Sequence, residues 1–248
     1  MYFKRKLRIF IIRESIFTKG RKTMKNIIIN KKILENNDNI AKRNRDAFEL
    51  NKVFTINLLG SPGCGKTTFL EGIIDKSKIN SNISVIEGDL YTTKDAKRIE
   101  DKGVDVIQLN TSGACHLDAG MIEKALLEID IEKIDLLVIE NVGNLVCPSE
   151  FDLGEDIKVT IMSIAEGNDK PLKYPAIFQK SSVVILNKMD MIDLTNFNLD
   201  EFYRDIYSIN KDVKVFEVSS INKKGLDEVM DYFINEINEK KMMCFYEE

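Results

Sequence analysis

The sequence is poor in several residue types that mark other classes of protein. Its 248 residues include no tryptophan, one histidine, four cysteines and four prolines. Four scattered cysteines cannot form the dense disulfide framework of a small secreted domain, so we expect free thiols and a cytoplasmic protein. No apolar run is long enough to cross a bilayer, and the net charge of −4 does not favour nucleic acid as a partner. We therefore expect neither membrane nor nucleic-acid binding.

Basic residues are concentrated at the N-terminus. Residues 1–23 hold eight lysines and arginines, and Glu14 is the one acidic residue among them. Arg8, Arg13 and Glu14 interrupt the apolar stretch and no small-residue cleavage site follows, so this leader does not resemble a signal peptide. We interpret residues 1–23 as disordered or as an artefact upstream of a natural start at Met24. A basic amphipathic surface segment is the alternative.

Apolar strands and helical segments alternate through the rest of the chain. A polar extension with helical spacing, residues 24–52, comes first, and a short tail, residues 241–248, comes last. Between them we predict strands at 53–59, 83–87, 105–109, 134–139, 157–164, 183–186 and 213–218, and helices that include 66–78, 92–101 and 116–129. Near-continuous apolar strands that alternate with helices are typical of a parallel sheet buried on both faces. Residues 53–240 are therefore predicted to form an α/β domain, a mostly parallel sheet flanked by helices on both faces.

A glycine-rich loop follows the first predicted strand. Its sequence, Gly60-Ser61-Pro62-Gly63-Cys64-Gly65-Lys66-Thr67, fits the phosphate-binding pattern G-x-x-x-x-G-K-[ST] in full. Glycines let successive N–H groups converge on phosphate oxygens, and the helix that follows adds its positive N-terminal end. Lys66 would neutralise the β- and γ-phosphates, and the Thr67 hydroxyl would bind Mg²⁺. We predict a P-loop NTPase whose nucleotide site is formed by residues 60–68, Thr68 included.

A second motif, at the end of the strand 183–186, specifies the base. In Asn187-Lys188-Met189-Asp190 the Asp190 carboxylate can accept two hydrogen bonds from guanine N1 and its exocyclic amine, which adenine cannot donate. Asn187 and Lys188 would support this loop and cover the base. Ser219 and Ser220 end the last strand, where GTPases place a backbone contact to guanine. The sequence thus predicts GTP rather than ATP, which disfavours a small-molecule kinase.

Two cysteines and the single histidine fall at the ends of other strands. Cys115 and His116 precede the predicted helix 116–129, and Cys147 follows the strand 134–139. Two thiolates and an imidazole suit Ni²⁺ or Zn²⁺, and a helix N-terminus at Cys115 would lower the pKa of its thiol. Spacing alone leaves metal binding and a purely structural role equally open, because no C-x₂-C pair is present. Three ligands would leave a labile site or one completed by a second subunit.

Two acidic residues complete the predicted nucleotide site. Glu140-x-x-Gly143 occupies the place where GTPases carry D-x-x-G, so Glu140 would hold Mg²⁺ through water. Asp89, at the end of the strand 83–87, is a second acidic candidate near Mg²⁺ and the attacking water. We predict Lys66, Asp89 and Glu140 as catalytic residues and Thr67, Asp89 and Glu140 as the Mg²⁺ site. Because Cys147 lies beyond Glu140 in the same loop, nucleotide state and metal geometry would be coupled.

Together these motifs resemble the HypB family, the hydrogenase nickel-incorporation GTPases of the SIMIBI class. The stretches Cys115-His116-Leu117-Asp118-Ala119 and Glu140–Pro148 are the most specific part of the resemblance. It implies a slow GTPase that forms a homodimer with GTP and delivers nickel during hydrogenase maturation. It also implies a nickel or zinc site of Cys115, His116 and Cys147 at the dimer interface, a small zinc-containing HypA-like partner, and the hydrogenase large subunit as an indirect one.

The chain departs from the family pattern in two ways. No cysteine precedes Cys64 and no histidine accompanies His116, so an N-terminal nickel-binding or nickel-storage motif is not expected. Cys64 stands in the phosphate loop where serine or alanine is commoner, either as an extra ligand and redox liability or as a tolerated small residue. Two alternatives stay open: a urease accessory-type nickel GTPase, and a nucleotide-bound metal carrier without useful turnover.

Overall fold

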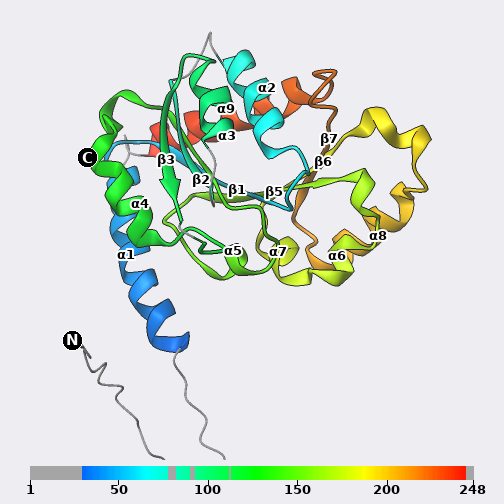
Figure 1. Ribbon diagram of the computed structural model, residues 1–248, viewed down its shortest axis with the longest axis horizontal. Helices are drawn as coiled ribbons and strands as arrows, with labels where there is room; N and C mark the ends of the chain where they lie inside the picture. Colours follow the sequence, from blue (N-terminus) through cyan, green and yellow to red (C-terminus); the bar gives the residue numbers. More distant parts are fainter. Residues whose placement is uncertain (1–29, 78–81, 90–92, 112, 244–248) are drawn as a thin grey trace, which may run out of the picture.

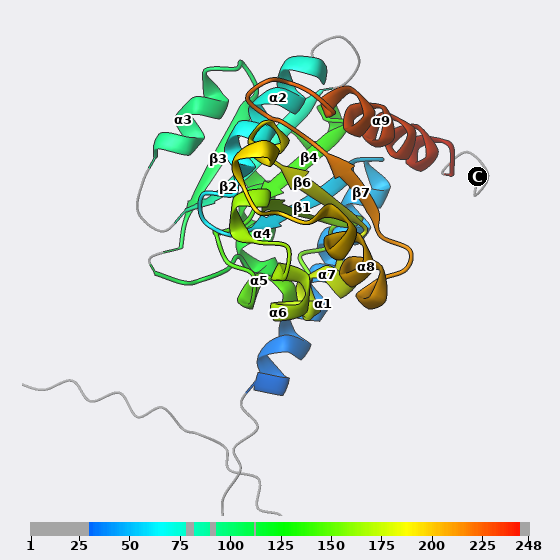
Figure 2. The same ribbon diagram turned by 90° about the vertical axis from the view of Figure 1, so that its right-hand side faces the viewer.

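Seven parallel strands form one sheet in the computed structural model, which describes residues 30–77, 82–89, 93–111 and 113–243. Their order across the sheet is β3-β2-β4-β1-β5-β6-β7, seen from two directions in Figures 1 and 2. The strands are β1 Phe54–Gly60, β2 Ile83–Asp89, β3 Asp105–Asn110, β4 Leu136–Glu140, β5 Ile157–Ser163, β6 Val183–Asn187 and β7 Lys214–Glu217. β1 pairs with both β4 and β5, so the strand that leads into the glycine-rich loop lies in the middle of the sheet.

Helices cover both faces of the sheet. Figure 1 shows α2, α3 and α9 above it and α1, α4, α7 and α8 below it. The α-helices are α1 Asn30–Leu50, α2 Lys66–Ser77, α3 Lys94–Glu100, α4 Ala119–Ala125, α5 Cys147–Glu150, α6 Lys170–Lys173, α7 Pro175–Lys180, α8 Leu199–Ile209 and α9 Leu226–Met243. Short 3₁₀ helices lie at Leu126–Glu128, Ile131–Lys133, Ile164–Glu166 and Met189–Leu194. The predicted α/β class, with a parallel sheet flanked on both faces, is confirmed.

Side chains of β1 point alternately to the two faces of the sheet, and both sets are buried by helices. Phe54, Ile56 and Leu58 belong to the core beneath α2 and α9, and the residues between them point to the opposite face. Thr55 and Asn57 therefore share that opposite face, and both are fully buried. A strand that is buried on both sides reads as a nearly continuous apolar run, which is why the strands could be predicted from the sequence.

The predicted helix 116–129 is wrong at both ends. The α-helix begins at Ala119, because the Asp118 side chain accepts a hydrogen bond from the Met121 N–H and caps it. It gives way after Ala125 to a 3₁₀ turn. Cys115 and His116 consequently lie in the loop before the helix, which changes the electrostatics expected at Cys115.

The N-terminal extension forms one long helix, α1. Its residues Ala41 and Phe48 are fully buried and Asn37 and Asn44 are buried beside them, so one face of the helix packs against the domain. The predicted leader, residues 1–23, lies outside the described residues, as do residues 244–248 of the predicted tail. None of the helices in the described ranges combines the length and apolar character needed to cross a membrane.

Candidate functional site

The predicted functional segments meet at the carboxyl edge of the sheet. β1 ends at Gly60, β2 at Asp89, β4 at Glu140 and β6 at Asn187. In a parallel sheet all of these ends lie along the same edge, which is where α/β proteins bind ligands. A cavity of about 460 Å³ opens there, within the size range of small-molecule sites. It is lined by Pro62, Gly63, Gly65, Lys66, Thr67, Thr68, Glu87, Gly88, Asp89, Asp95, Arg98, Glu140, Asn141, Val142, Gly143 and Lys188.

The glycine-rich loop wraps one end of this cavity. Gly65 has a φ of +100°, and a Cβ there would lie 2.5 Å from the Asn187 side-chain nitrogen, so this position accepts no other residue without rearrangement. The Lys66 ammonium group lies 3.5 Å from the carbonyl oxygens of Gly60 and Ser61. Lys66 and Thr67 open α2 directly beside the cavity. The loop therefore offers a cation and the N-terminus of a twelve-residue helix to an anionic ligand.

Two buried carboxyl groups face the same cavity. Glu140 accepts a hydrogen bond from the Thr67 hydroxyl at 2.9 Å, while its Oε2 and the Oε2 of Glu87 have no hydrogen-bond partner among the described residues. Burial raises the pKa of Glu140 to about 7. Burial, and then the charges of Glu140 and Asp89, raise the pKa of Glu87 to about 8. Buried, unpartnered carboxylate oxygens beside a hydroxyl fit a hard cation such as Mg²⁺, which would lower both pKa values.

Glu87 was missed by the sequence analysis, which singled out Asp89. The signal was available, because residues two apart on a strand point to the same face. Asp89 itself lines the cavity as predicted. The structure thus brings together Thr67, Asp89 and Glu140, the three residues predicted for Mg²⁺, and adds Glu87 as a third acidic group.

The predicted base-recognition residues form a connected group beside the glycine-rich loop. The Asn187 amide donates to the Cys64 carbonyl at 3.0 Å, and its oxygen accepts from the Ser220 hydroxyl at 2.9 Å. Lys188, in a left-handed conformation with φ +64°, donates to the Gly63 carbonyl at 2.7 Å. Asp190 is exposed and accepts from the Ser219 hydroxyl at 2.5 Å.

These bonds tie the base-recognition group to the phosphate loop. Asn187, Asp190, Ser219 and Ser220 lie outside the lining of the main cavity, which reaches this group only at Lys188. Gly60, Ser61 and Cys64 do not line it either. Cys64 is buried, and burial raises the pKa of its thiol to about 11. Cys64 does not belong to the cluster of Cys115, His116 and Cys147, and a buried thiol with a raised pKa is a poor metal ligand and a poor nucleophile, so it fits a tolerated small residue better than an extra ligand or a redox liability.

Cys115, His116 and Cys147 come together although 32 residues separate the first and the last. Their candidate ligand atoms all lie within 4.8 Å of one another, and the Cys115 sulfur is 3.6 Å from Nδ1 of His116. Cys115 is exposed and the other two are half-buried. Two sulfurs and an imidazole at this spacing can converge on a borderline or soft divalent cation.

The protonation of this cluster differs from the expectation. Cys115 lies four residues before α4, and a hydrogen bond with Cys147, followed by burial, raises the pKa of its thiol, so the predicted lowering by a helix N-terminus is wrong. Burial lowers the pKa of His116, so that the ring favours the neutral form that binds metals. The His116 ring stacks on Phe151, with ring centroids 3.8 Å apart. Phe151 had no sequence signal as a site residue.

One loop joins the cavity to this cluster. Residues 140–147, which we call the switch loop, begin at Glu140 in the cavity wall and end at Cys147. Asn144 of this loop makes an antiparallel bridge to Gly60 of the glycine-rich loop, and its side chain donates to the Cys115 carbonyl at 3.3 Å. Both candidate sites therefore share one loop of eight residues.

Comparison with known proteins agrees with this geometry. The model of the CobW/HypB/UreG nucleotide-binding domain family matches residues 54–217. Hydrogenase maturation factor HypB of Escherichia coli K12 is 41% identical over 200 residues, which cover 81% of this chain and 69% of that protein. Hydrogenase/urease maturation factor HypB of Helicobacter pylori J99 is 38% identical over 231 residues, covering 92% and 95% of the two chains. The crystal structure of Helicobacter pylori HypB in complex with nickel has a TM-score of 0.79 at 38% identity and covers 82% of this chain and 96% of that one.

Proposed function

The chain belongs to the HypB family, and on that premise we propose that it is a GTP-hydrolysing metallochaperone that delivers nickel during nickel–iron hydrogenase maturation. The observation that carries the proposal is the shared switch loop, which runs from the cavity wall at Glu140 to the thiol of Cys147. A phosphate-binding loop alone would support only a nucleotide-dependent enzyme. A thiol–imidazole cluster alone would support only a metal carrier.

The nucleotide part of the proposal rests on the groups around the cavity. Lys66 would hold the β- and γ-phosphates, and Asp190 would select guanine through two accepted hydrogen bonds. Thr67, Asp89 and Glu140 would hold Mg²⁺, which when bound neutralises charge on the phosphate oxygens. The Thr67 hydroxyl is already held 2.9 Å from Glu140, so two of these ligands lie side by side.

Nickel is the cargo in this proposal, held by Cys115, His116 and Cys147. Three ligands leave one coordination position open, which suits an ion that must be handed on. A second copy of the chain, bound in the GTP state, would supply the remaining contact. A small zinc-containing HypA-like protein would be the immediate partner and the hydrogenase large subunit an indirect one. The Helicobacter pylori relative, a hydrogenase/urease maturation factor, favours a urease as a second destination.

The test is a titration with Ni²⁺ of the full chain loaded with Mg²⁺ and either GDP or a non-hydrolysable GTP analogue. We expect the two nucleotides to give different nickel affinities, and nickel to change nucleotide affinity by the same factor. The oligomeric state, followed by light scattering, should change with the nucleotide. Identical nickel affinities in both nucleotide states would leave a carrier whose nucleotide is not coupled to its cargo.

A further inference from the structure

The Asn141 side chain connects the wall of the nucleotide cavity to the backbone next to His116. Asn141 lines the nucleotide cavity directly after Glu140, and it is almost fully buried. Its Oδ1 accepts from the N–H of Leu117, the residue after His116, at 3.1 Å, and from the N–H of Val142 at 3.0 Å. The oxygen is therefore fixed by two backbone donors, and the amide nitrogen must point the other way.

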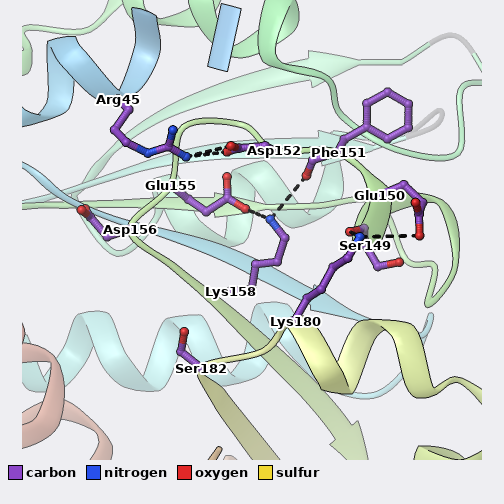
Figure 3. Close-up of a pocket in the computed structure, with 10 residues that line it drawn as sticks. All are labelled: Arg45, Ser149, Glu150, Phe151, Asp152, Glu155, Asp156, Lys158, Lys180 and Ser182. Carbon is purple, nitrogen blue, oxygen red and sulfur yellow. Dashed lines mark hydrogen bonds and ion pairs between the residues drawn. The ribbon is translucent and has the colours of Figure 1, made fainter. Parts of the chain in front are cut away.

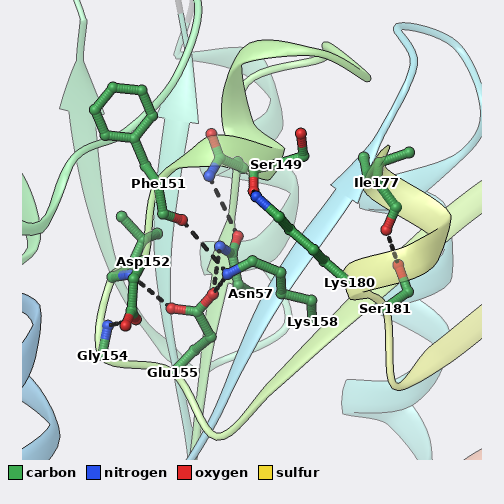
Figure 4. Close-up of polar contacts among 12 residues, drawn as sticks. Asn57, Ser149, Phe151, Asp152, Gly154, Glu155, Lys158, Ile177, Lys180 and Ser181 are labelled. Carbon is green, nitrogen blue, oxygen red and sulfur yellow. Dashed lines mark hydrogen bonds and ion pairs between the residues drawn. The ribbon is translucent and has the colours of Figure 1, made fainter. Parts of the chain in front are cut away.

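A buried chain of hydrogen bonds continues from that nitrogen. The Asn141 amide donates to Asn57 Oδ1 at 3.2 Å, and Asn57 Nδ2 donates to Glu155 at 3.1 Å. Glu155 also accepts from the Leu153 N–H at 2.6 Å and forms an ion pair with Lys158. Figures 3 and 4 show Lys158 between Glu155 and the backbone carbonyl of Phe151. Each donor in this series faces an acceptor. The orientation of the Asn141 amide therefore fixes which group donates and which accepts in every later hydrogen bond.

The chain returns to His116 by a second route. Lys158 donates to the Phe151 carbonyl at 3.4 Å, and the Phe151 ring stacks on the imidazole. His116 is consequently held through the neighbouring Leu117 N–H on one side and through Phe151 on the other. Both sets of contacts start from the Asn141 side chain. Its neighbour Glu140 accepts a hydrogen bond from the hydroxyl of Thr67 in the nucleotide cavity.

We propose that Asn141 is the positioning residue through which the nucleotide-binding loop sets the orientation of His116, with Asn57 and Glu155 holding its amide in place. This inference rests on the proposed function, since it names the route of the coupling proposed above. Closely packed, fully hydrogen-bonded groups transmit small shifts because a displaced partner leaves a buried polar group unpaired. Neither Asn57 nor Glu155 lines the nucleotide cavity or belongs to the metal cluster. If replacing either residue changes the coupling between nucleotide and nickel, the change must reach the two sites through the hydrogen bonds to Asn141.

The experiment measures the ratio of Ni²⁺ dissociation constants in Mg²⁺–GDP and in a Mg²⁺–GTP analogue, using the full chain and a chromophoric chelator as competitor. We expect wild type to show a ratio of about 5 to 150, the usual range of allosteric coupling. Asn57→Asp keeps the Oδ1 that accepts from the Asn141 amide. It replaces the Nδ2 that donates to Glu155 with an oxygen, which repels the Glu155 carboxylate. Its ratio should fall to within about twofold of one, while the affinity for GDP stays within a few-fold of wild type.

Thr55→Val is the matched control. Thr55 is a fully buried polar residue on the same face of β1 as Asn57, and its side chain takes no part in the hydrogen bonds that link Asn141, Asn57 and Glu155. It should retain the wild-type ratio. Glu155→Gln, which weakens the next link, repeats the test if Asn57→Asp does not fold. On wild type, hydrogen exchange at the Leu117 amide should differ between the two nucleotide states.

The outcomes separate the two proposals. The role of the hydrogen-bond chain would be overturned by a folded Asn57→Asp or Glu155→Gln variant that keeps the wild-type ratio of nickel dissociation constants. Equal hydrogen exchange at Leu117 in both nucleotide states would overturn it too. Either result would leave the coupling itself intact. A ratio of one in wild type would instead overturn the coupling itself, and with it this inference.

Discussion

At the scale of single residues, the site is dominated by side chains whose protonation or pairing depends on what is bound. Glu87 and Glu140 are buried carboxyl groups with raised pKa values, and within the part of the chain that the structure describes each has one oxygen without a hydrogen-bond partner. Asp190 is an exposed carboxylate held by a serine. The two glutamates face the proposed cation and Asp190 the proposed base, so these two roles can be tested separately.

The two buried glutamates predict how stability depends on pH. A carboxyl group with a pKa raised from 4.5 to about 7 or 8 stays protonated in the folded protein after the unfolded chain has released its proton. The free energy of unfolding of the metal-free protein should therefore fall as pH rises from about 4.5 to about 8. Mg²⁺ replaces those protons, so the stabilisation by Mg²⁺ should grow over the same range.

Thermal unfolding at several pH values, with Mg²⁺ and with a chelator, checks this dependence. In the presence of the chelator, Glu87→Gln should reduce the fall in stability toward pH 8, because a glutamine side chain cannot ionise. A metal-free protein that becomes more stable between these pH values would contradict the assignment.

Replacing Asp190 predicts a loss of guanine binding. Asp190→Asn keeps the size but presents an amide N–H₂ to the two guanine donors, which costs about 1.5–3 kcal/mol for a hydrogen bond to a charged group. GTP affinity should fall by roughly tenfold to a hundredfold. Titration with a fluorescent GTP analogue measures it, and Asp193→Asn, an exposed change in the same 3₁₀ helix, is the control. Equal affinities in all three proteins would remove Asp190 from the site.

At the scale of secondary-structure elements, α1 connects the two segments that carry the metal cluster. Asn44 donates to the carbonyls of Ala119 and Leu153, at 3.0 and 2.9 Å. Asn37 accepts from the Ala119 N–H and donates to the Asp152 carbonyl, at 2.9 and 2.7 Å. Ala119 follows His116 by three residues, and Asp152 follows the Phe151 that stacks on it. α1 therefore holds the starts of α4 and of the loop after α5 in one arrangement.

Asn44→Ala should separate these segments. It leaves two buried carbonyls without their side-chain donor, so we expect a loss of about 1–3 kcal/mol in the free energy of unfolding. Nickel affinity should weaken, whereas nucleotide affinity should stay close to wild type because α1 does not line the cavity. Denaturant unfolding and nickel titration measure the two effects. Asn36→Ala, an exposed change on the same helix, should leave nickel affinity unchanged and cost no stability, because alanine is the better helix former. A matching loss in that variant would show that the effect is not specific to the hydrogen bonds of Asn44.

Strands and the glycine-rich loop were predictable from the sequence, because burial on both faces and phosphate binding restrict residue types over consecutive positions. Asn57 was not, since an isolated polar residue in an apolar strand shows neither its partner nor its direction. Asn141 and Glu155 were not either, because they lie in loops just outside β4 and β5, where polar residues are common. The start of α4 was misplaced because apolar spacing continues through Leu117, while the Asp118 cap that stops it was not considered.

At the scale of the whole molecule, the three-ligand cluster predicts assembly. Cys115 is exposed and the cluster offers three ligand atoms, so a second copy can approach it and complete the coordination. With Ni²⁺ and a GTP analogue, the mass in solution should double from the 28.4 kDa of one chain. Light scattering coupled to gel filtration measures it, with GDP as the reference state. A single-chain mass under every condition would limit the protein to a monomeric carrier.

The stacking of His116 on Phe151 has a practical consequence. The chain contains one imidazole, and its ring plane lies at 23° to the neighbouring aromatic ring. In a proton NMR spectrum the two carbon-bound imidazole protons would give a single pair of lines, displaced by the ring current of the phenyl group. The imidazole is thus a natural NMR reporter within the proposed metal cluster, readable without a label or an introduced probe.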